Sequence, residues 1–266
     1  MSSPTILNDP RIRSIPWRDL TRLTWPEVAW ELSLWAPWLA LSLTMAGRGL
    51  YVPAMAASFV FFLTGLRQVH NAYHQTLGVS RGVSEAVMFV LSVLMLGSMH
   101  AVKFNHLRHH QHCMGDDDVE AMGARMSAWK AILTGPLFPV RMHLKALREA
   151  NPRQVRWIGA ELAANAAWIA LVFGVLGVPA LKYHVAAMAV GQCLASFFCV
   201  WTVHHDCDRS AVLARTLRQK LMNVASFNMF YHLEHHLFPQ VPTCHLPTLT
   251  ERLDGVAPEW PRKEVF

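Results

Sequence analysis

Charged side chains are scarce in this chain. Asp, Glu, Lys and Arg together make up 16% of its 266 residues, against roughly 25% in an ordinary soluble domain. Apolar residues take their place and reach 53% of the sequence. This balance argues against a water-soluble enzyme and indicates a protein that lies within a membrane.

Several cofactor and metal motifs are also missing. The sequence contains no GxGxxG dinucleotide turn, no HPGG haem motif and no ferredoxin-type cysteine array, so a redox activity would need a separate electron donor. Its five cysteines form no CxxC pair, which predicts reduced thiols. Neither HExxH nor Glu-x-x-His occurs, which argues against a zinc hydrolase and excludes a ferritin-like carboxylate site.

Long apolar runs are abundant. Four of them, at 28–47, 50–66, 157–178 and 181–203, are long enough to cross about 30 Å of hydrocarbon, which needs roughly 20 residues. Short turns join the first two and the last two. The sequence therefore predicts an all-α integral membrane fold with four transmembrane helices in two hairpins, interfacial helices and a cytoplasmic cap that carries the histidines described below.

The basic residues are distributed unevenly about these runs. Of the 24 Lys and Arg residues, only Arg48 and Lys182 fall at the hairpin turns, which leaves 22 on the other side. The positive-inside rule then places both termini in the cytoplasm. We expect one domain over 1–266, with 1–27 as a cytoplasmic N-terminal segment and 204–266 as a cytoplasmic tail. The net charge of +6 is read as an orientation signal, and no nucleic-acid partner is expected.

Histidines are concentrated in three short boxes. These are HNAYH at 70–74, HLRHH at 106–110 and HLEHH at 232–236, and a further pair follows the last apolar run in TVHHDCD. Residues three or four apart share one helix face, so each box presents its rings as a cluster. Neutral imidazole binds iron, zinc or copper, which predicts a metal site. Isolated histidines are expected to have ordinary structural roles: His100, His112, His143, His184 and His245.

The boxes also constrain a fifth apolar run at 83–102. Box one precedes this run and box two follows it, and both must reach one site. The run must therefore start and end on the same side of the membrane, which predicts an interfacial or re-entrant helix. A basic amphipathic pattern at 140–150, with Val140, Leu144 and Leu147 on one face, predicts another helix at the membrane surface.

The boxes, in this order, and the segment NMFYHLEHHLFPQVP at 228–242 resemble the membrane fatty acid desaturase superfamily. This superfamily includes acyl-lipid desaturases, alkane hydroxylases, sphingolipid desaturases, and carotenoid ketolases and hydroxylases. The resemblance covers residues 70–242 and implies a non-haem di-iron centre that uses O2 and two external electrons to oxidise an unactivated C–H bond. The HxxxH first box is similar to that of acyl-lipid desaturases and carotenoid ketolases.

The resemblance implies a set of iron ligands, position by position. The expected ligands are His70, His74, His106, His109, His110, His232, His235 and His236, with either His204 or His205 as a further one. Ligating imidazoles need a partner for their other ring nitrogen. Among the acids and amides beside the boxes, we expect Asp118, Asp206 and Asn228 to provide it.

The resulting hypothesis is an enzyme that desaturates a long-chain fatty acyl lipid in the membrane, with ferredoxin or cytochrome b5 and its reductase as separate electron donor. We expect it in a bacterial inner membrane. A hydroxylase or ketolase acting on a fatty acyl, alkane or carotenoid substrate is the nearest alternative. A haem-binding membrane electron-transfer subunit and a zinc-dependent membrane hydrolase are more distant ones.

Overall fold

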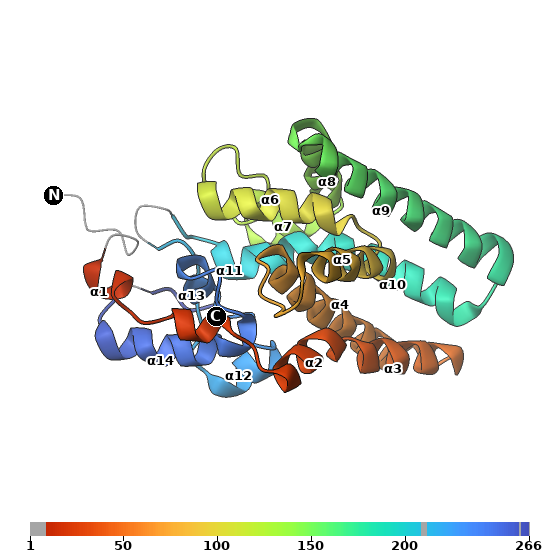
Figure 1. The fold of residues 1–266 in the computed structure, drawn as a ribbon. Helices are drawn as coiled ribbons and strands as arrows, with labels where there is room; N and C mark the ends of the chain where they lie inside the picture. Colours follow the sequence, from red (N-terminus) through yellow and green to blue (C-terminus); the bar gives the residue numbers. More distant parts are fainter. Residues whose placement is uncertain (1–8, 209–211, 261, 266) are drawn as a thin grey trace.

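The computed structural model describes residues 9–208, 212–260 and 262–265 (Figure 1). The regular secondary structure of the described residues is helical apart from two isolated bridges, so the predicted all-α fold is confirmed. The elements of the first half are α1 (Pro10–Arg13), η2 (Arg18–Thr21), α2 (Trp25–Ser33), α3 (Ala36–Gly47), α4 (Tyr51–Tyr73), α5 (Arg81–Met95), α6 (Met99–His112), η3 (Glu120–Met122), α7 (Ala128–Leu133) and α8 (Leu137–Glu149). Those of the second half are α9 (Pro152–Leu171), η4 (Val172–Leu176), α10 (Pro179–Ala195), η5 (Ser196–Trp201), α11 (Thr202–His204), α12 (Lys220–Ala225), α13 (His232–Leu237), η6 (Thr243–His245) and α14 (Leu246–Val256).

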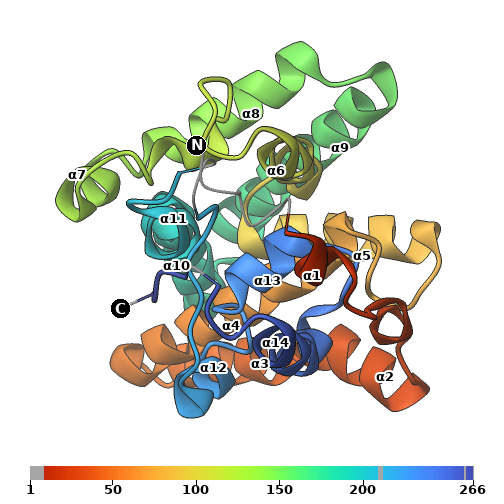
Figure 2. The ribbon, with the colours of Figure 1, turned by 90° about the vertical axis from the view of Figure 1, so that its left-hand side faces the viewer.

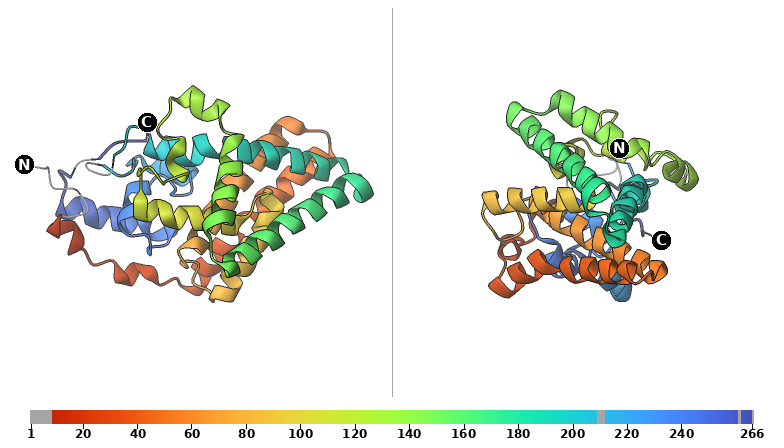
Figure 3. Two further views of the ribbon diagram at one scale, coloured as in Figure 1. Left: turned by 90° about the horizontal axis from the view of Figure 1, so that it is seen from above. Right: turned by 90° about the vertical axis from the view of Figure 1, so that its right-hand side faces the viewer.

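Two helical hairpins form the membrane part. In the described residues three continuous helices are long and apolar enough to span: Tyr51–Tyr73, Pro152–Leu176 and Pro179–His204. They correspond to the predicted runs at 50–66, 157–178 and 181–203. The turns of both hairpins lie at the same end of the molecule, on the right in Figure 1, and Figure 3 shows the hairpins one above the other. Near the turns they meet through Ala46, Ala54 and Ala180, whose small side chains allow close helix approach.

The remaining predicted span, at 28–47, differs from expectation. The structure divides it into α2 and α3, and α3 has only 12 residues, a rise of about 18 Å. The break precedes Pro37, which has no N–H to donate to the carbonyl of Ser33. Glu31, in α2, is 1% exposed and turned inward. The first part of this run therefore forms a separate short helix, whose Glu31 pairs with Arg67, and only α3 pairs with α4 in the hairpin.

The fifth run is a bent helix pair. The axes of α5 and α6 meet at 111°, and Leu96 between them adopts a left-handed φ of 56°. The Nε2 atoms of His74, before the pair, and His106, within α6, are 3.0 Å apart. The segment thus returns to the side from which it starts, in agreement with the re-entrant prediction.

Side chains from two other helices, α8 and α10, cap the backbone of this bend. Nε2 of His184 donates to the carbonyl of Leu94 at 2.8 Å, and Nε2 of Gln192 to that of Met95 at 2.8 Å. The N–H of Ser98 donates to Nε2 of His143 at 2.9 Å. Non-helical backbone at membrane depth requires such partners because lipid supplies none. Two of the isolated histidines therefore have the structural roles expected of them.

The amphipathic helix predicted at 140–150 is α8. Val140, Leu144 and Leu147 are 53%, 45% and 39% exposed, and Arg141 and Arg148 are exposed beside them. This composition suits the membrane surface.

The histidine end of the bundle is covered by both termini. Figure 2 looks onto this end, with α13 central and α6, α11 and α14 around it. Ile12 and Ile15 pack with Leu249 and Leu253 of α14 in one buried apolar cluster. The N-terminal residues described here therefore hold the tail against the bundle; residues 1–8 of the predicted N-terminal segment lie outside the described residues.

The cap on the bend yields a stability prediction. Gln192→Leu removes the donor to the Met95 carbonyl, and an unpaired buried carbonyl costs about 1–3 kcal/mol. We expect a lower unfolding midpoint for the protein in detergent, measured by thermal denaturation. Val190→Leu, on the exposed face of the same helix, should leave the midpoint unchanged. Equal midpoints for both variants would contradict a role for the cap.

Candidate metal centre

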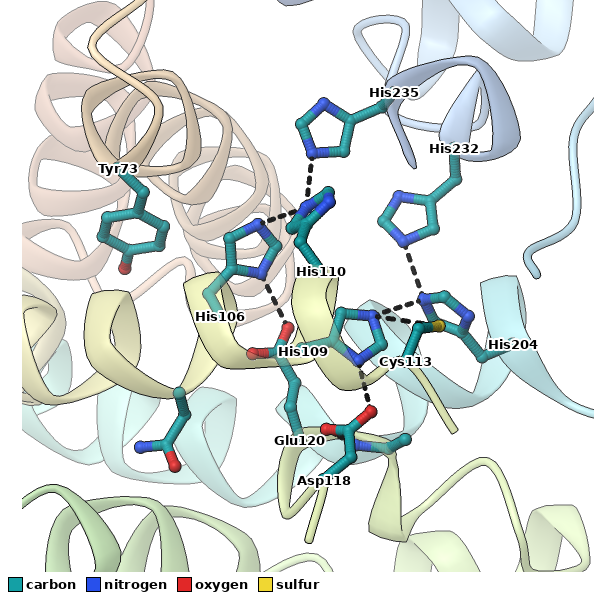
Figure 4. Close-up of polar contacts among 12 residues, drawn as sticks. Tyr73, His106, His109, His110, Cys113, Asp118, Glu120, His204, His232 and His235 are labelled. Atoms are coloured by element: carbon teal, nitrogen blue, oxygen red, sulfur yellow. Dashed lines mark hydrogen bonds and ion pairs between the residues drawn. The ribbon is translucent and has the colours of Figure 1, made fainter. Parts of the chain in front are cut away.

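The three boxes lie on three different helices. Box one ends α4, with His70 in its last turn and His74 at its C-cap. Box two lies on α6 and box three on the six-residue helix α13. His204 ends α11, which continues α10 through the π-helical turn η5. Figure 4 shows side chains from α6, α11 and α13 directed at one another.

Five imidazoles form the first group. Each offers one ring nitrogen, and these atoms all lie within 4.8 Å of one another. Nε2 of His106 lies 3.0 Å from that of His74 and 3.2 Å from that of His110, which in turn lies 3.0 Å from Nε2 of His235. The members of group one are His70, His74, His106, His110 and His235.

Four further imidazoles form the second group. Nε2 of His204 lies 3.0 Å from Nε2 of His109 and 2.9 Å from that of His232. Nε2 of His236 lies 3.3 Å from that of His109 and 3.2 Å from that of His232. The two groups adjoin, since the rings of His110 and His236 are stacked with centroids 4.3 Å apart. All four members of group two are buried: His109, His204, His232 and His236.

These spacings fit ligands around a cation. Metal–nitrogen bonds of about 2.1 Å at angles of 90–109° separate neighbouring ligand atoms by roughly 3.0–3.4 Å, as seen in both groups. The His70 ring adds a second observation, because neither of its buried nitrogens has a hydrogen-bond partner in the described residues. A metal ion in each group would supply the missing partner, so the donor set fits two borderline transition-metal ions.

The structure distinguishes between the two adjacent histidines of TVHHDCD. His204 belongs to group two, whereas the ring of His205 stacks on Trp201 at 3.9 Å and 4° and donates from Nδ1 to the Trp201 carbonyl at 2.8 Å. His205 is therefore not brought to either group. Of the two histidines that the sequence offered as a further ligand, His204 is the one that joins a group.

Three of the histidines are oriented through Nδ1. The ring of His109 is bonded to Oδ2 of Asp118 at 2.7 Å, and that of His106 to Oε1 of Glu120 at 2.9 Å. Nδ1 of His204 donates to the Leu213 carbonyl at 3.0 Å. Such partners fix the tautomer and direct Nε2 at the metal position.

Of the three residues expected to orient a ligating histidine, one does so. Asp118 contacts His109, as expected. Asp206 does not, because its side chain is 80% exposed and lies 3.4 Å from Arg215. In the described residues the Asn228 side chain makes no hydrogen bond to a histidine; Asn228 has a left-handed φ of 64° in the turn before box three. Glu120 was missed, although its place in the acidic run after box two was a signal.

Burial determines the charge of the site. It lowers the pKa of His232, His235 and His236 well below the usual value, and neighbouring imidazoles lower it further. These rings are therefore neutral at pH 7, the form that binds metals. Burial also raises the pKa of Glu120 to about 7. Burial opposes ionisation of Asp118 as well, but the hydrogen bond and charge attraction from His109, together with the backbone N–H groups of Ala121 and Met114, outweigh it and lower the pKa of Asp118.

The non-histidine residues of the boxes hold the helices in place. In box one, Asn71 donates to Glu31 at 3.0 Å and accepts from the Thr243 hydroxyl at 2.7 Å. Glu31 also forms a buried ion pair with Arg67, which donates to the Phe227 carbonyl at 2.7 Å. This network ties the end of α4 to α2 and to the tail.

Box three is held in a similar way. Its Glu234 is 0% exposed and pairs with Arg218 at 2.7 Å, while the Thr216 hydroxyl donates to it at 2.7 Å. Glu234 therefore points away from the imidazoles and anchors α13. Arg218, which also pairs with Asp254 at 2.8 Å, is engaged within the tail.

Comparison with known proteins agrees with this geometry. The family model described as fatty acid desaturase matches residues 49–264, well over half of the chain. The chain is 27% identical over 257 residues to a sphingolipid delta(4)-desaturase/C4-monooxygenase of Bos taurus, covering 90% of this chain and 75% of the relative. The protein of that name from Rattus norvegicus is 26% identical over 202 residues, which cover 72% of this chain and 61% of the relative. The chain thus spans less than two thirds of the length of the second relative.

Histidine boxes, adjoining imidazole groups and spanning helices are therefore found together with a family match over most of the sequence. The chain belongs to the fatty acid desaturase family, whose members are desaturase- and hydroxylase-type oxidoreductases.

Proposed function

We propose that this protein binds two iron ions, one in each imidazole group, and uses O2 to desaturate a long hydrocarbon chain of a membrane lipid. The observation that carries the proposal is the pair of adjoining groups with Nε2 atoms 2.9–3.3 Å apart at one end of a membrane bundle. Nine imidazole nitrogen donors with no carboxylate among them suit borderline transition-metal ions, a class that includes iron.

The overall reaction balances without a protein nucleophile. One O2, two electrons and two protons convert a –CH2–CH2– unit into –CH=CH– and two waters. When bound, the iron pair supplies the O2 activation and the hydrogen abstraction. The electrons come from a separate donor protein of the ferredoxin or cytochrome b5 type. Arg218 is already paired with Glu234 and Asp254, so it offers that donor no uncompensated charge.

The chain's own residues orient the ligands and exclude water. Asp118, Glu120 and the Leu213 carbonyl hold three rings by Nδ1. Tyr73 packs against His106 with ring centroids 5.6 Å apart and donates to Sδ of Met99 at 3.5 Å. Met99 belongs to the apolar cluster of α4 and α5, which includes Phe61 and Leu91. This cluster keeps the membrane side of the site dry.

The names of the relatives favour a lipid substrate and are compatible with two products, an alkene and an alcohol. Their printed name combines a desaturase with a C4-monooxygenase, so hydroxylation is the second candidate reaction here, and a sphingoid-based lipid is one candidate substrate. A single haem is disfavoured, because two adjoining groups of five and four imidazoles exceed the two axial ligands that a haem takes.

We also propose the orientation inferred from charge. Residues 1–27, the tail at 204–266 and the metal centre would face the cytoplasm, and the hairpin turns with Arg48 and Lys182 would face outward. The centre would then be accessible to a cytoplasmic electron donor.

Expression in host cells tests the reaction. Mass spectrometry of the lipid extract should reveal a lipid two hydrogens lighter than its precursor, absent from cells that carry a His109→Ala variant. Fatty acyl, sphingoid and carotenoid precursors are supplied separately, so that the class is identified. A product with one added oxygen would favour hydroxylation. Identical lipids with and without the protein, despite measured iron loading and a competent donor, would contradict the proposal.

Ligand substitution tests the assignment of the groups. His109→Ala or His236→Ala should abolish turnover and lower iron per chain, because each removes a nitrogen from group two. His205→Ala is the matched control, and its iron content and turnover should stay near wild type. Elemental analysis and lipid product formation measure the two quantities. Unchanged iron in His109→Ala, or loss in His205→Ala, would count against this set of ligands.

The orienting carboxylates give a graded prediction. Asp118→Asn removes the charged partner of His109, and loss of such a partner lowers metal affinity about 10–100-fold. Competition with a chelator measures this affinity. Asp206→Asn, an equal chemical change at an exposed carboxylate of the same region, should have no effect. If both variants released iron equally, the contact between Asp118 and His109 would have no specific role.

A further inference from the structure

An open cavity lies outside the metal centre, at the start of α9. It encloses about 470 Å³ and is lined by Arg153, Arg156, Trp157 and Ala160. Because α9 is a candidate span that begins on the histidine side of the bundle and ends at the hairpin turn (Figure 1), its first turns lie at the level of the membrane interface. A cavity at this depth faces lipid headgroups.

The cavity has an excess of positive charge. Glu85 is shared between Arg81 at 3.1 Å and Arg153 at 3.3 Å. Lys103 interacts electrostatically with all three of these residues. In the part of the chain that the structure describes, Arg156 and Lys103 form no salt bridge. Beside the cavity, four cations therefore share the single buried carboxylate of Glu85, a net charge of +3 that favours an external anion.

The nearest other acid cannot neutralise this excess. Glu161 is 0% exposed and is bound to Nδ1 of His100 at 2.7 Å and to the Ser98 hydroxyl at 2.5 Å. Its carboxylate thus accepts hydrogen bonds from residues at the bend between α5 and α6. Apart from Glu85, α5, α6 and α9 therefore offer no carboxylate to the guanidinium groups.

An aromatic wall makes the cavity rigid. The indole of Trp157 stacks on His100 with centroids 4.8 Å apart and an angle of 3°, and it meets Phe89 at 6.3 Å. His100 is itself held by Glu161. Because Trp157 is fixed from behind, the first turn of α9 presents its guanidinium groups from a defined surface. Tryptophan is also the residue preferred where hydrocarbon meets headgroups.

Apolar surface continues from the cavity toward the hydrocarbon. On α5, Val83 and Val90 are 44% and 49% exposed. On α9, a Cβ added to Gly159 would meet nothing within 4 Å, and Ala160 is exposed. A ligand with an anionic head and apolar tails could contact both the basic cavity and this apolar surface. A soluble anion would contact only the basic cavity.

We propose that this cavity binds the phosphate group of an anionic phospholipid, with Arg153 and Arg156 as its ligands and Trp157 as its wall. Guanidinium groups bind phosphate oxygens by paired, charge-assisted hydrogen bonds. The N-terminal end of α9 adds a favourable dipole. Neither iron nor turnover is needed for this binding, so it can be tested separately from the proposed reaction.

Binding of dioctanoyl phosphatidylglycerol to the full chain in detergent, followed by native mass spectrometry, tests the proposal. Arg153→Gln combined with Arg156→Gln should weaken binding about 30-fold, because each Arg near a headgroup contributes about a fivefold gain in affinity. The control, Arg141→Gln combined with Arg148→Gln, removes the same charge from the exposed face of α8 and should bind like wild type. Arg156→Lys, which keeps the charge, should retain most of the affinity.

Binding of other ligands, and of phosphatidylglycerol to metal-depleted protein, tests whether the site is specific for an anionic lipid and independent of iron. Dioctanoyl phosphatidylcholine should bind weakly, and metal-depleted protein should bind phosphatidylglycerol as well as iron-loaded protein does. Equal loss in the α8 control would reveal unspecific attraction and overturn the site. Inorganic phosphate that binds as tightly as the lipid, with the same dependence on Arg153 and Arg156, would overturn the assignment to a lipid. Unchanged unfolding midpoints establish that the variants are folded.

Discussion

The structure depends on the packing of nine imidazole rings, seven buried and two half-buried, at one end of an apolar bundle. A buried polar atom without a partner costs about 1–3 kcal/mol, and a crowd of Nε2 atoms cannot satisfy itself, because every hydrogen bond between two rings needs one donor and one acceptor. Asp118, Glu120 and the Leu213 carbonyl satisfy Nδ1 atoms on the outside of the groups. The Nε2 atoms remain directed inward. The two cations that we propose would resolve this conflict for all the rings at once.

Much of the surrounding fold can be understood as support for this arrangement. The bend at Leu96 returns α6 to the histidine side, and His143, His184 and Gln192 supply the hydrogen bonds that lipid cannot. Box one is tied to the tail through Asn71, and box three through Glu234. The Asn71–Thr243 contact joins residues 172 positions apart, and the bend is capped from the second hairpin, so the site forms only when both hairpins and the tail are assembled.

The sequence predicted the fold class, the re-entrant segment and the grouping of the boxes, because hydropathy and helical spacing are local properties. It could not choose between His204 and His205, which differ by about 100° around a helix; the choice depends on the π-helical turn η5 that precedes them. Asp206 follows a histidine in sequence but turns outward, whereas Glu120 reaches His106 across a loop. The division of the first apolar run at Pro37 was visible in the sequence, although the run's length outweighed that signal.

X-ray absorption at the iron edge of the purified protein tests the central claim most directly. Each iron should have a first shell of nitrogen and oxygen at roughly 2.1 Å, with the outer-shell scattering of four to five imidazoles, matching the two groups. A sample that holds only zinc, or iron with one or two imidazoles or the signature of haem, would contradict the account.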